Sequence, residues 1–157
     1  NLGNGKFENI TARSGDIYGA KKVGRGLAYG DFNNDGAMDV LATNAGDAPN
    51  LYRNDGGNAN NWLRIRTVGT KSNRDGIGAR VRLTAEGRTQ SLDVRPNASF
   101  LSTNDPRPLF GLGHASRVET IEVRWPSGQV DTVGPVEANR TITVVEGKGI
   151  GQEEVGR

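Results

Sequence analysis

The sequence predicts an all-β fold, and three observations support this prediction. Short runs of alternating or β-branched residues recur along the 157 residues, and each is bounded by Gly, Pro, Asn or Asp, which favour turns. Glycine is unusually frequent, at 23 residues, and it falls between these runs, where tight turns need positive φ angles. No long segment carries the apolar period of a helix.

Ten strands are expected, most of them short. In chain order they cover residues 26–29, 39–43, 50–53, 62–68, 79–85, 89–94, 99–102, 120–124, 131–136 and 141–146. Many short strands separated by turns are typical of a sandwich, a barrel or a piece of a propeller.

The chain is expected to divide into a repeat-like region, a second β region and a tail. Residues 1–5 resemble residues 54–58, and a spacing of about fifty residues suits a propeller blade. The repeat-like region then covers residues 1–58, and the second region covers residues 59–146. Residues 147–157 are rich in Gly and Glu and are expected to form a tail, which could dock on an adjacent subunit.

The turn between the first two expected strands is rich in oxygen donors. Calcium takes six to eight hard oxygen ligands at about 2.3–2.6 Å, whereas magnesium prefers a stricter octahedron with retained waters. Acidic or amide side chains at every second residue, with a glycine at the turn, meet the requirement of calcium. The expected Ca²⁺ ligands are Asp31, Asn33, Asp35, the backbone carbonyl of Ala37, and Asp39. The alternative is an Asp/Asn-rich hairpin turn without an ion.

Residues 26–41, with their continuation at 50–56, resemble the FG-GAP/VCBS repeat of integrin-type β-propellers. The shared motif is D-x-[DN]-x-D-G-x-x-D, which residues 31–39 match. The resemblance implies a hairpin or blade fragment in which Asp31, Asn33, Asp35 and Asp39 bind calcium between two strands.

The second region is similar to the ASPIC/UnbV domain, through motifs at residues 61–63, 75–81, 99–102, 110–113 and 123–128. This resemblance implies a β-sandwich-like domain in a secreted protein. Phe110, Leu112, Ile121, Val123 and Trp125 are expected in its core.

Two further candidate sites lie in the second region. Asn73 and Asp75 could form a second calcium site with backbone carbonyls, or an Asx turn without metal. A polar cluster could line a groove for a sugar stacked on Trp125 or Phe100, or could be a polar loop between strands. The cluster consists of Asn97, Ser99, Ser102, Thr103, Asn104 and Asp105.

Several functional classes are not expected. The chain has no cysteine and a single histidine, His114, and no serine lies in a G-x-S-x-G context, so we expect no enzyme. The carboxylates of Glu86, Asp93, Glu119 and Glu122 leave a glycosidase pair open. A net charge of +2 without interleaved aromatic residues argues against nucleic acid, and no apolar run approaches the length of a membrane span.

These observations together predict a non-catalytic, calcium-binding adhesion, surface or assembly module. The protein is expected to be secreted, at the cell surface or in the periplasm, with a protein or glycan partner. A lone blade leaves strand edges unpaired, which favours a homo-oligomer or filament formed through strand addition. The alternative is a carbohydrate-binding module attached to a larger secreted protein.

Overall fold

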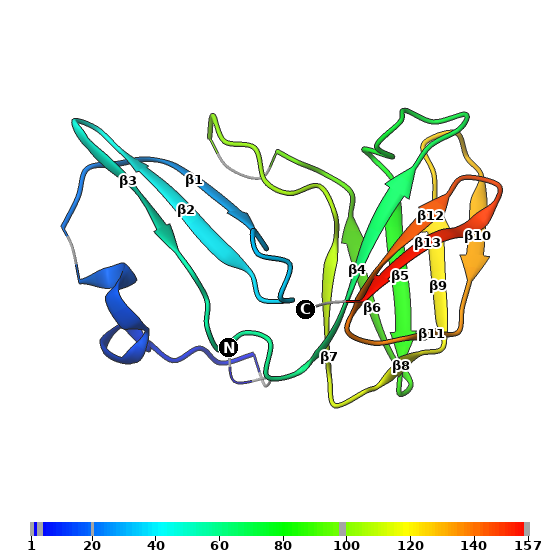
Figure 1. The fold of residues 1–157 in the computed structure, drawn as a ribbon, viewed down its shortest axis with the longest axis horizontal. Helices are drawn as coiled ribbons and strands as arrows, with labels where there is room; N and C mark the ends of the chain where they lie inside the picture. Colours follow the sequence, from blue (N-terminus) through cyan, green and yellow to red (C-terminus); the bar gives the residue numbers. More distant parts are fainter. Residues whose placement is uncertain (1, 3–4, 20, 98–99, 156–157) are drawn as a thin grey trace.

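The structure is a computed structural model that describes residues 2, 5–19, 21–97 and 100–155. The described residues form thirteen strands and two short 3₁₀ turns, with no α-helix. The predicted all-β class is therefore confirmed. No helix in this part of the chain is long and apolar enough to cross a membrane. Figure 1 shows the first three strands standing beside a larger body formed by the other ten.

The first sheet is antiparallel and has the order β1-β2-β3. Its strands are β1 (Gly24–Gly30), β2 (Asp39–Asn44) and β3 (Asp47–Tyr52). The two 3₁₀ turns η1 (Thr11–Arg13) and η2 (Gly15–Tyr18) precede it. Gly46, with a φ of 69°, closes the tight turn between β2 and β3.

The larger body contains two four-stranded sheets. One has the order β13-β12-β4-β7 and the other β10-β9-β5-β6, while β8 and β11 form a small pair. The first of these sheets is mixed, because β12 runs parallel to β4. The bounds are β4 (Asn61–Val68), β5 (Arg80–Ala85), β6 (Arg88–Asp93), β7 (Leu109–Gly113), β8 (Arg117–Val118), β9 (Thr120–Arg124), β10 (Val130–Val133), β11 (Val136–Glu137), β12 (Arg140–Val145) and β13 (Gly149–Val155).

The core lies between these two sheets, so the body is a β-sandwich. Successive side chains of a strand point to opposite faces, and residues two apart are buried together on the inner face of each central strand. These residues are Leu63 and Ile65 on β4, Val81 and Leu83 on β5, Ile121 and Val123 on β9, and Ile142 and Val144 on β12. Burying each such side chain contributes about 1.5–3 kcal/mol.

The predicted core residues are found where expected. Phe110, Leu112, Ile121, Val123 and Trp125 all belong to the buried cluster of the sandwich. In contrast, Ala37 is the only buried apolar residue among those described before β4. The first sheet therefore has almost no core of its own.

The structure differs from the expected strands in three places. The strand predicted for residues 131–136 is divided into β10 and β11, because Pro135 lacks an N–H and cannot continue a ladder. The strand predicted for residues 99–102 lies partly outside the described residues, and Phe100 and Leu101 form a turn. Strands β7 and β8 were not predicted, although the inward positions of β7 were.

The expected tail at residues 147–157 is also corrected. Gly149–Val155 forms β13, which pairs antiparallel with β12 of the same chain. The side of β13 that faces β12 is therefore paired within the chain, and β13 forms an edge of its sheet.

Candidate functional site

The loop at residues 31–39 connects β1 to β2 and faces the sandwich. Two residues in the left-handed region shape it, Asn34 with a φ of 60° and Gly36 with a φ of 89°. Asp31 and Asp39, at its two ends, are buried. The structure thus brings the predicted ligands into one compact turn.

Backbone amides donate to all three carboxylates of the loop. Asp31 accepts hydrogen bonds from the amides of Asp35 (3.0 Å) and Gly36 (2.8 Å). Asp35 accepts one from the amide of Ala37 (2.8 Å). Asp39 accepts one from the amide of Phe32 (3.1 Å) and one from the amide of Asn54 after β3 (2.8 Å). These bonds hold the loop closed and tie it to the end of β3.

The donor set fits calcium in its chemistry. All the predicted ligands offer hard oxygens, and a carboxylate has about four lone-pair sites, so each acid retains acceptor capacity beyond its amide bonds. However, among the described side chains no group of three or more His, Cys, Asp or Glu is gathered as metal ligands. Calcium binding by this loop therefore stays a prediction.

A buried guanidinium supplies positive charge to the loop. Arg64 of β4 places Nη1 3.2 Å from Oδ2 of Asp31, and both side chains are almost fully buried. Its Nε donates to Oγ1 of Thr141 (3.0 Å), and the guanidinium lies 5.6 Å from the centroid of the Trp62 ring. Sequence reasoning missed Arg64, because it alternates with the apolar residues Leu63 and Ile65 as an arginine on the solvated face of a strand would.

The same loop packs directly on Trp62. A Cβ atom added to Gly36 would lie 2.0 Å from Nε1 of Trp62, so the backbone of the loop touches the indole ring. Through this contact and the Arg64–Asp31 ion pair, the loop is the joint between the first sheet and the sandwich.

The other predicted site residues have mainly structural contacts. Asn73 exchanges two hydrogen bonds of 2.8 Å with the backbone of Ile77, which hold the turn of residues 73–77. The backbone carbonyl of Asp75 accepts a hydrogen bond from Thr67.

Trp125 is only 2% exposed, and its Nε1 donates to Asp131 (2.7 Å). It is therefore a core residue that no sugar can reach, whereas Phe100 is 79% exposed.

Residues 102–105 of the predicted polar cluster cover one edge of the first sheet. Ser102 Oγ accepts a hydrogen bond from the amide of Leu27 (3.1 Å), and Asn104 Oδ1 accepts one from the amide of Tyr29 (2.9 Å). The amide of Asp105 donates to the carbonyl of Tyr29 (3.2 Å). Ser99 lies outside the described residues. Residues 102–105 thus take the place of a strand beside β1.

Glu146 is a buried acid that sequence reasoning missed. Its Oε2 accepts hydrogen bonds from three successive amides, those of Thr70 (2.8 Å), Lys71 (2.7 Å) and Ser72 (2.7 Å), and Ser127 donates to its Oε1. Burial raises the pKa of this carboxyl, but the bonds from Ser127 and the amides outweigh it and lower the pKa to about 2. The sequence did indicate that Glu146 is buried, because it continues the alternation of inward-facing residues that Ile142 and Val144 begin.

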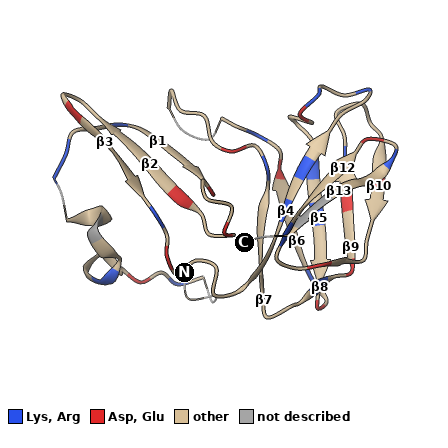
Figure 2. Cartoon of the chain, viewed as in Figure 1, with Lys and Arg blue, Asp and Glu red and all other residues tan. Residues whose placement is uncertain are grey.

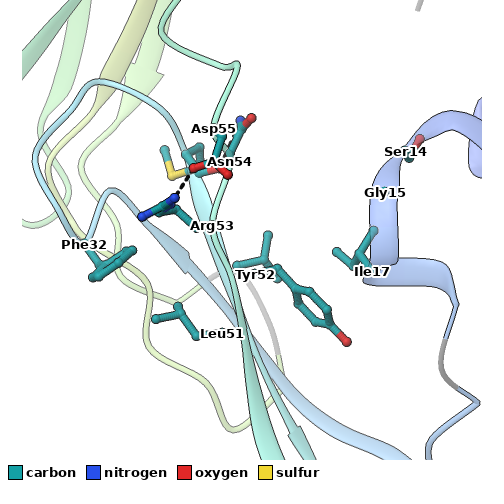
Figure 3. A pocket seen from close by; sticks show the side chains of 11 residues that line it. Ser14, Gly15, Ile17, Phe32, Leu51, Tyr52, Arg53, Asn54 and Asp55 are labelled. Carbon is teal, nitrogen blue, oxygen red and sulfur yellow. Dashed lines mark hydrogen bonds and ion pairs between the residues drawn. The ribbon is translucent and has the colours of Figure 1, made fainter.

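A hollow of about 690 Å³ lies at the free side of β3. Figure 3 shows Leu51 and Phe32 on one side of this strand, and Tyr52 and Ile17 on the other. Met38 and Val40 also line it, so the hollow covers part of the β2–β3 face as well as the edge of β3, opposite η2. Figure 2 shows acidic and basic residues interspersed along both parts of the molecule.

Comparisons with known proteins place most of the sandwich in one family. The family model described as ASPIC and UnbV matches residues 69–151. Cartilage acidic protein 1 of Mus musculus is 27% identical over 137 residues, which cover 83% of this chain and 21% of that protein. The protein of the same name from Xenopus tropicalis is 30% identical over 127 residues, covering 77% of this chain and 19% of that protein. The chain thus spans about a fifth of the length of these relatives.

Proposed function

This chain belongs to the ASPIC and UnbV family, and we propose that it is a non-catalytic, secreted adhesion or assembly module with a calcium-binding loop. The main observation in support of this proposal is the position of residues 31–39, which join a repeat-like sheet to the sandwich. The match of this loop to the FG-GAP/VCBS motif supports calcium, and the similarity to cartilage acidic protein 1 supports a secreted location.

The loop is proposed to bind Ca²⁺ through Asp31, Asn33, Asp35, the carbonyl of Ala37, and Asp39. The ion would add charge neutralisation to that of Arg64, which lies at ion-pair distance from Asp31. The loop holds two further carboxylates, those of Asp35 and Asp39, and the charge of Arg53 acts on both. A divalent cation would therefore relieve repulsion that remains in the loop.

Thermal unfolding in calcium and in EGTA tests this proposal. A ligand at a hundredfold excess over its dissociation constant stabilises the native state by about 2.7 kcal/mol. In a chain of this size that corresponds to a rise in Tm of roughly 5–10 °C. Asp35→Ala should abolish the rise, whereas Asp93→Ala, which removes an acid from β6, should retain it. An equal Tm in both buffers, with no heat on calcium titration, would show that hydrogen bonds and Arg64 alone close the loop.

The absence of catalysis is also part of the proposal. His114 is exposed in the turn after β7, and no serine occupies a nucleophile-elbow context. Turnover on a panel of esters or polysaccharides, lost on substitution of His114 or of Glu122, would contradict it.

Carbohydrate binding is the second candidate, and the exposure of Phe100 favours it. Of the two aromatic residues predicted to stack on a sugar, Trp125 is in the core and Phe100 is accessible. Glycan-array binding that disappears with Phe100→Ala, while Leu101→Ala retains it, would support this alternative.

A further inference from the structure

A second hollow, of about 460 Å³, lies between the first sheet and the sandwich and is here called the β7 hollow. Trp62 of β4 and residues of β7 line it from the sandwich, and Gly36 and Asn54 line it from the first part of the chain. Asn60 also lines it, in the segment that leads from the first sheet to the sandwich (Figure 1). Small-molecule sites have volumes of roughly 300–1,000 Å³ and occur preferentially where two parts of a protein meet.

The lining of the β7 hollow is neutral. Among the described residues that line it there is no charged side chain, and its polar side chains are Asn54, Asn60, Asn61 and Trp62. An amide side chain offers donors and an acceptor, as a hydroxyl group does. A charged ligand would lose its hydration here without gaining an ion pair, so the lining favours a neutral ligand that carries both donors and acceptors.

The indole N–H of Trp62 makes no hydrogen bond to a described residue. Trp62 is only 5% exposed, and a buried tryptophan usually finds an acceptor, as Trp125 does in Asp131 (2.7 Å). Nε1 of Trp62 lies against Gly36, which lines the same hollow, and the protein does not fully enclose it. A hydroxyl oxygen in the β7 hollow would supply the missing acceptor.

Gly111 leaves an open place beside this N–H. Gly111 and Trp62 are cross-strand partners, so a side chain at position 111 would project from the same face of the sheet as Trp62. A Cβ built there meets no described atom within 4 Å. Gly113 has a φ of 63°, but Gly111 is not in the left-handed region, so neither backbone nor packing requires a glycine. A glycine inside a strand often marks a close approach by a ligand.

The asparagines of the hollow combine a fixed wall with free polar groups. Asn61 is held at both ends, because its Nδ2 donates to the carbonyl of His114 (3.1 Å) and its Oδ1 accepts from Asn139 (2.8 Å). Asn60 makes no hydrogen bond to a described residue, and Oδ1 of Asn54 accepts none from one. The amide of Asn60 and the oxygen of Asn54 are therefore available to hydroxyl groups.

We propose that the β7 hollow binds a neutral saccharide. Its hydroxyl groups bond to the N–H of Trp62 and to the amide of Asn60, and its ring lies over Gly111. The partly buried side chains of Met38 and Leu109, which also line the hollow, contact the C–H groups of the ring. The inference gives the second candidate function, carbohydrate binding, a site away from Phe100, and it does not rest on calcium binding.

A glycan array probed with the full chain is the first test. The array carries neutral oligosaccharides of glucose, galactose, mannose and N-acetylglucosamine, with sulfated and sialylated glycans beside them. Neutral oligosaccharides should bind, and added sulfate or sialic acid should not strengthen binding, because no cationic side chain lines the hollow. Binding confined to the anionic glycans would overturn the inference.

Calorimetric titration with the strongest neutral oligosaccharide from the array then tests the site. Gly111→Val fills the open place with a residue that suits a strand, and should weaken binding at least tenfold. Gly24→Val is the matched control, because Gly24 is a strand glycine outside the hollow that also meets no described atom within 4 Å. Asn60→Ala should weaken binding roughly twofold to tenfold. Circular dichroism should show every variant folded.

The two tryptophans provide a readout at the level of one atom. In nuclear magnetic resonance spectra, the indole N–H signal of Trp62 should shift on saturation with the same oligosaccharide, since it gains an acceptor. The signal of Trp125 should stay, because its N–H is already bonded to Asp131. Trp62→Phe assigns the two signals, and a bound oligosaccharide that leaves the Trp62 signal in place would contradict the proposed site.

The remaining outcomes separate this inference from the functions proposed above. Binding that is lost with Phe100→Ala but kept with Gly111→Val would place the sugar at Phe100 and overturn the β7 hollow alone. Absence of binding to every glycan would overturn both carbohydrate sites. The calcium-binding adhesion role would still stand in that case, since the unfolding experiment in calcium and in EGTA tests it separately.

Discussion

Glu146 shows how one residue fixes distant segments of the sandwich. It lies just after β12, and its carboxylate collects the amides of residues 70–72, which precede β5. Hydrogen bonds to a charged acceptor are about twice as strong as neutral ones, and an amide left without its acceptor is costly when buried. Glu146 therefore anchors the long connection between β4 and β5.

The lowered pKa of Glu146 predicts a stability that depends on pH. A carboxyl with a folded pKa of about 2, below its ordinary value of 4.5, binds its proton more weakly in the native state. Its contribution to stability is then complete above pH 4.5 and is lost as the pH falls toward 2. Glu146→Gln should lower the Tm by several degrees at neutral pH, and the difference from wild type should shrink between these two values. Exposed Glu137→Gln is the control, and a Tm difference for Glu146→Gln that persists unchanged at pH 2 would contradict the assignment.

At the scale of elements, period-two patterns with β-branched residues located most of the strands. The expected 120–124 coincides with β9, and the predictions for β2, β4, β5 and β12 differ by one residue at one or both ends. β7 and β13 were missed because Gly111, Gly113, Gly149 and Gly151 dilute the pattern, and such strands form through backbone pairing with β4 and β12. The strand propensity of a segment does not show which other segment will pair with it.

The candidate loop was predicted more completely than its surroundings. The spacing of Asp31, Asn33, Asp35 and Asp39 indicated one compact turn, and the structure has it. Arg64 and Trp62 could not be assigned to the loop, because they follow it by about thirty residues and only the tertiary fold brings them together. Likewise, the covering of β1 by residues 102–105 depends on a contact across 75 residues.

The packing of the loop on Trp62 predicts that Gly36 cannot be replaced. Gly36→Ala forces a Cβ into the indole ring at 2.0 Å and also strains the left-handed backbone, so we expect a loss of roughly 3 kcal/mol or more. Gly46→Ala has the same left-handed backbone but meets nothing within 4 Å, and should cost only about 1–2 kcal/mol. Urea unfolding of the two variants measures the difference, and equal losses would show that the contact with Trp62 contributes nothing.

At the scale of the whole molecule, the two parts depend on each other unequally. The apolar core cluster lies entirely within residues 63–150, while the strands of the first sheet carry no buried apolar residue and have little to stabilise them alone. The sandwich supports the first sheet through Trp62 and Arg64, on which the loop packs. The first sheet contributes Asp31, whose carboxylate pairs with the buried guanidinium of Arg64.

This asymmetry predicts that residues 59–157 fold alone and that the role of Arg64 changes when they do. In the full chain Arg64→Met leaves Asp31 buried without its partner, which should cost roughly 3–5 kcal/mol. In the shorter chain Asp31 is absent and Arg64 faces water, so the same substitution should cost no more than about 0.5 kcal/mol. Arg66→Met, on the exposed side of β4, is the matched control and should be near neutral in both chains. Urea unfolding followed by tryptophan fluorescence gives all six free energies of unfolding. If Arg64→Met lowers the free energy of unfolding equally in both chains, its effect comes from Thr141 and the sandwich. If the shorter chain does not unfold cooperatively, the first sheet is needed to complete the core.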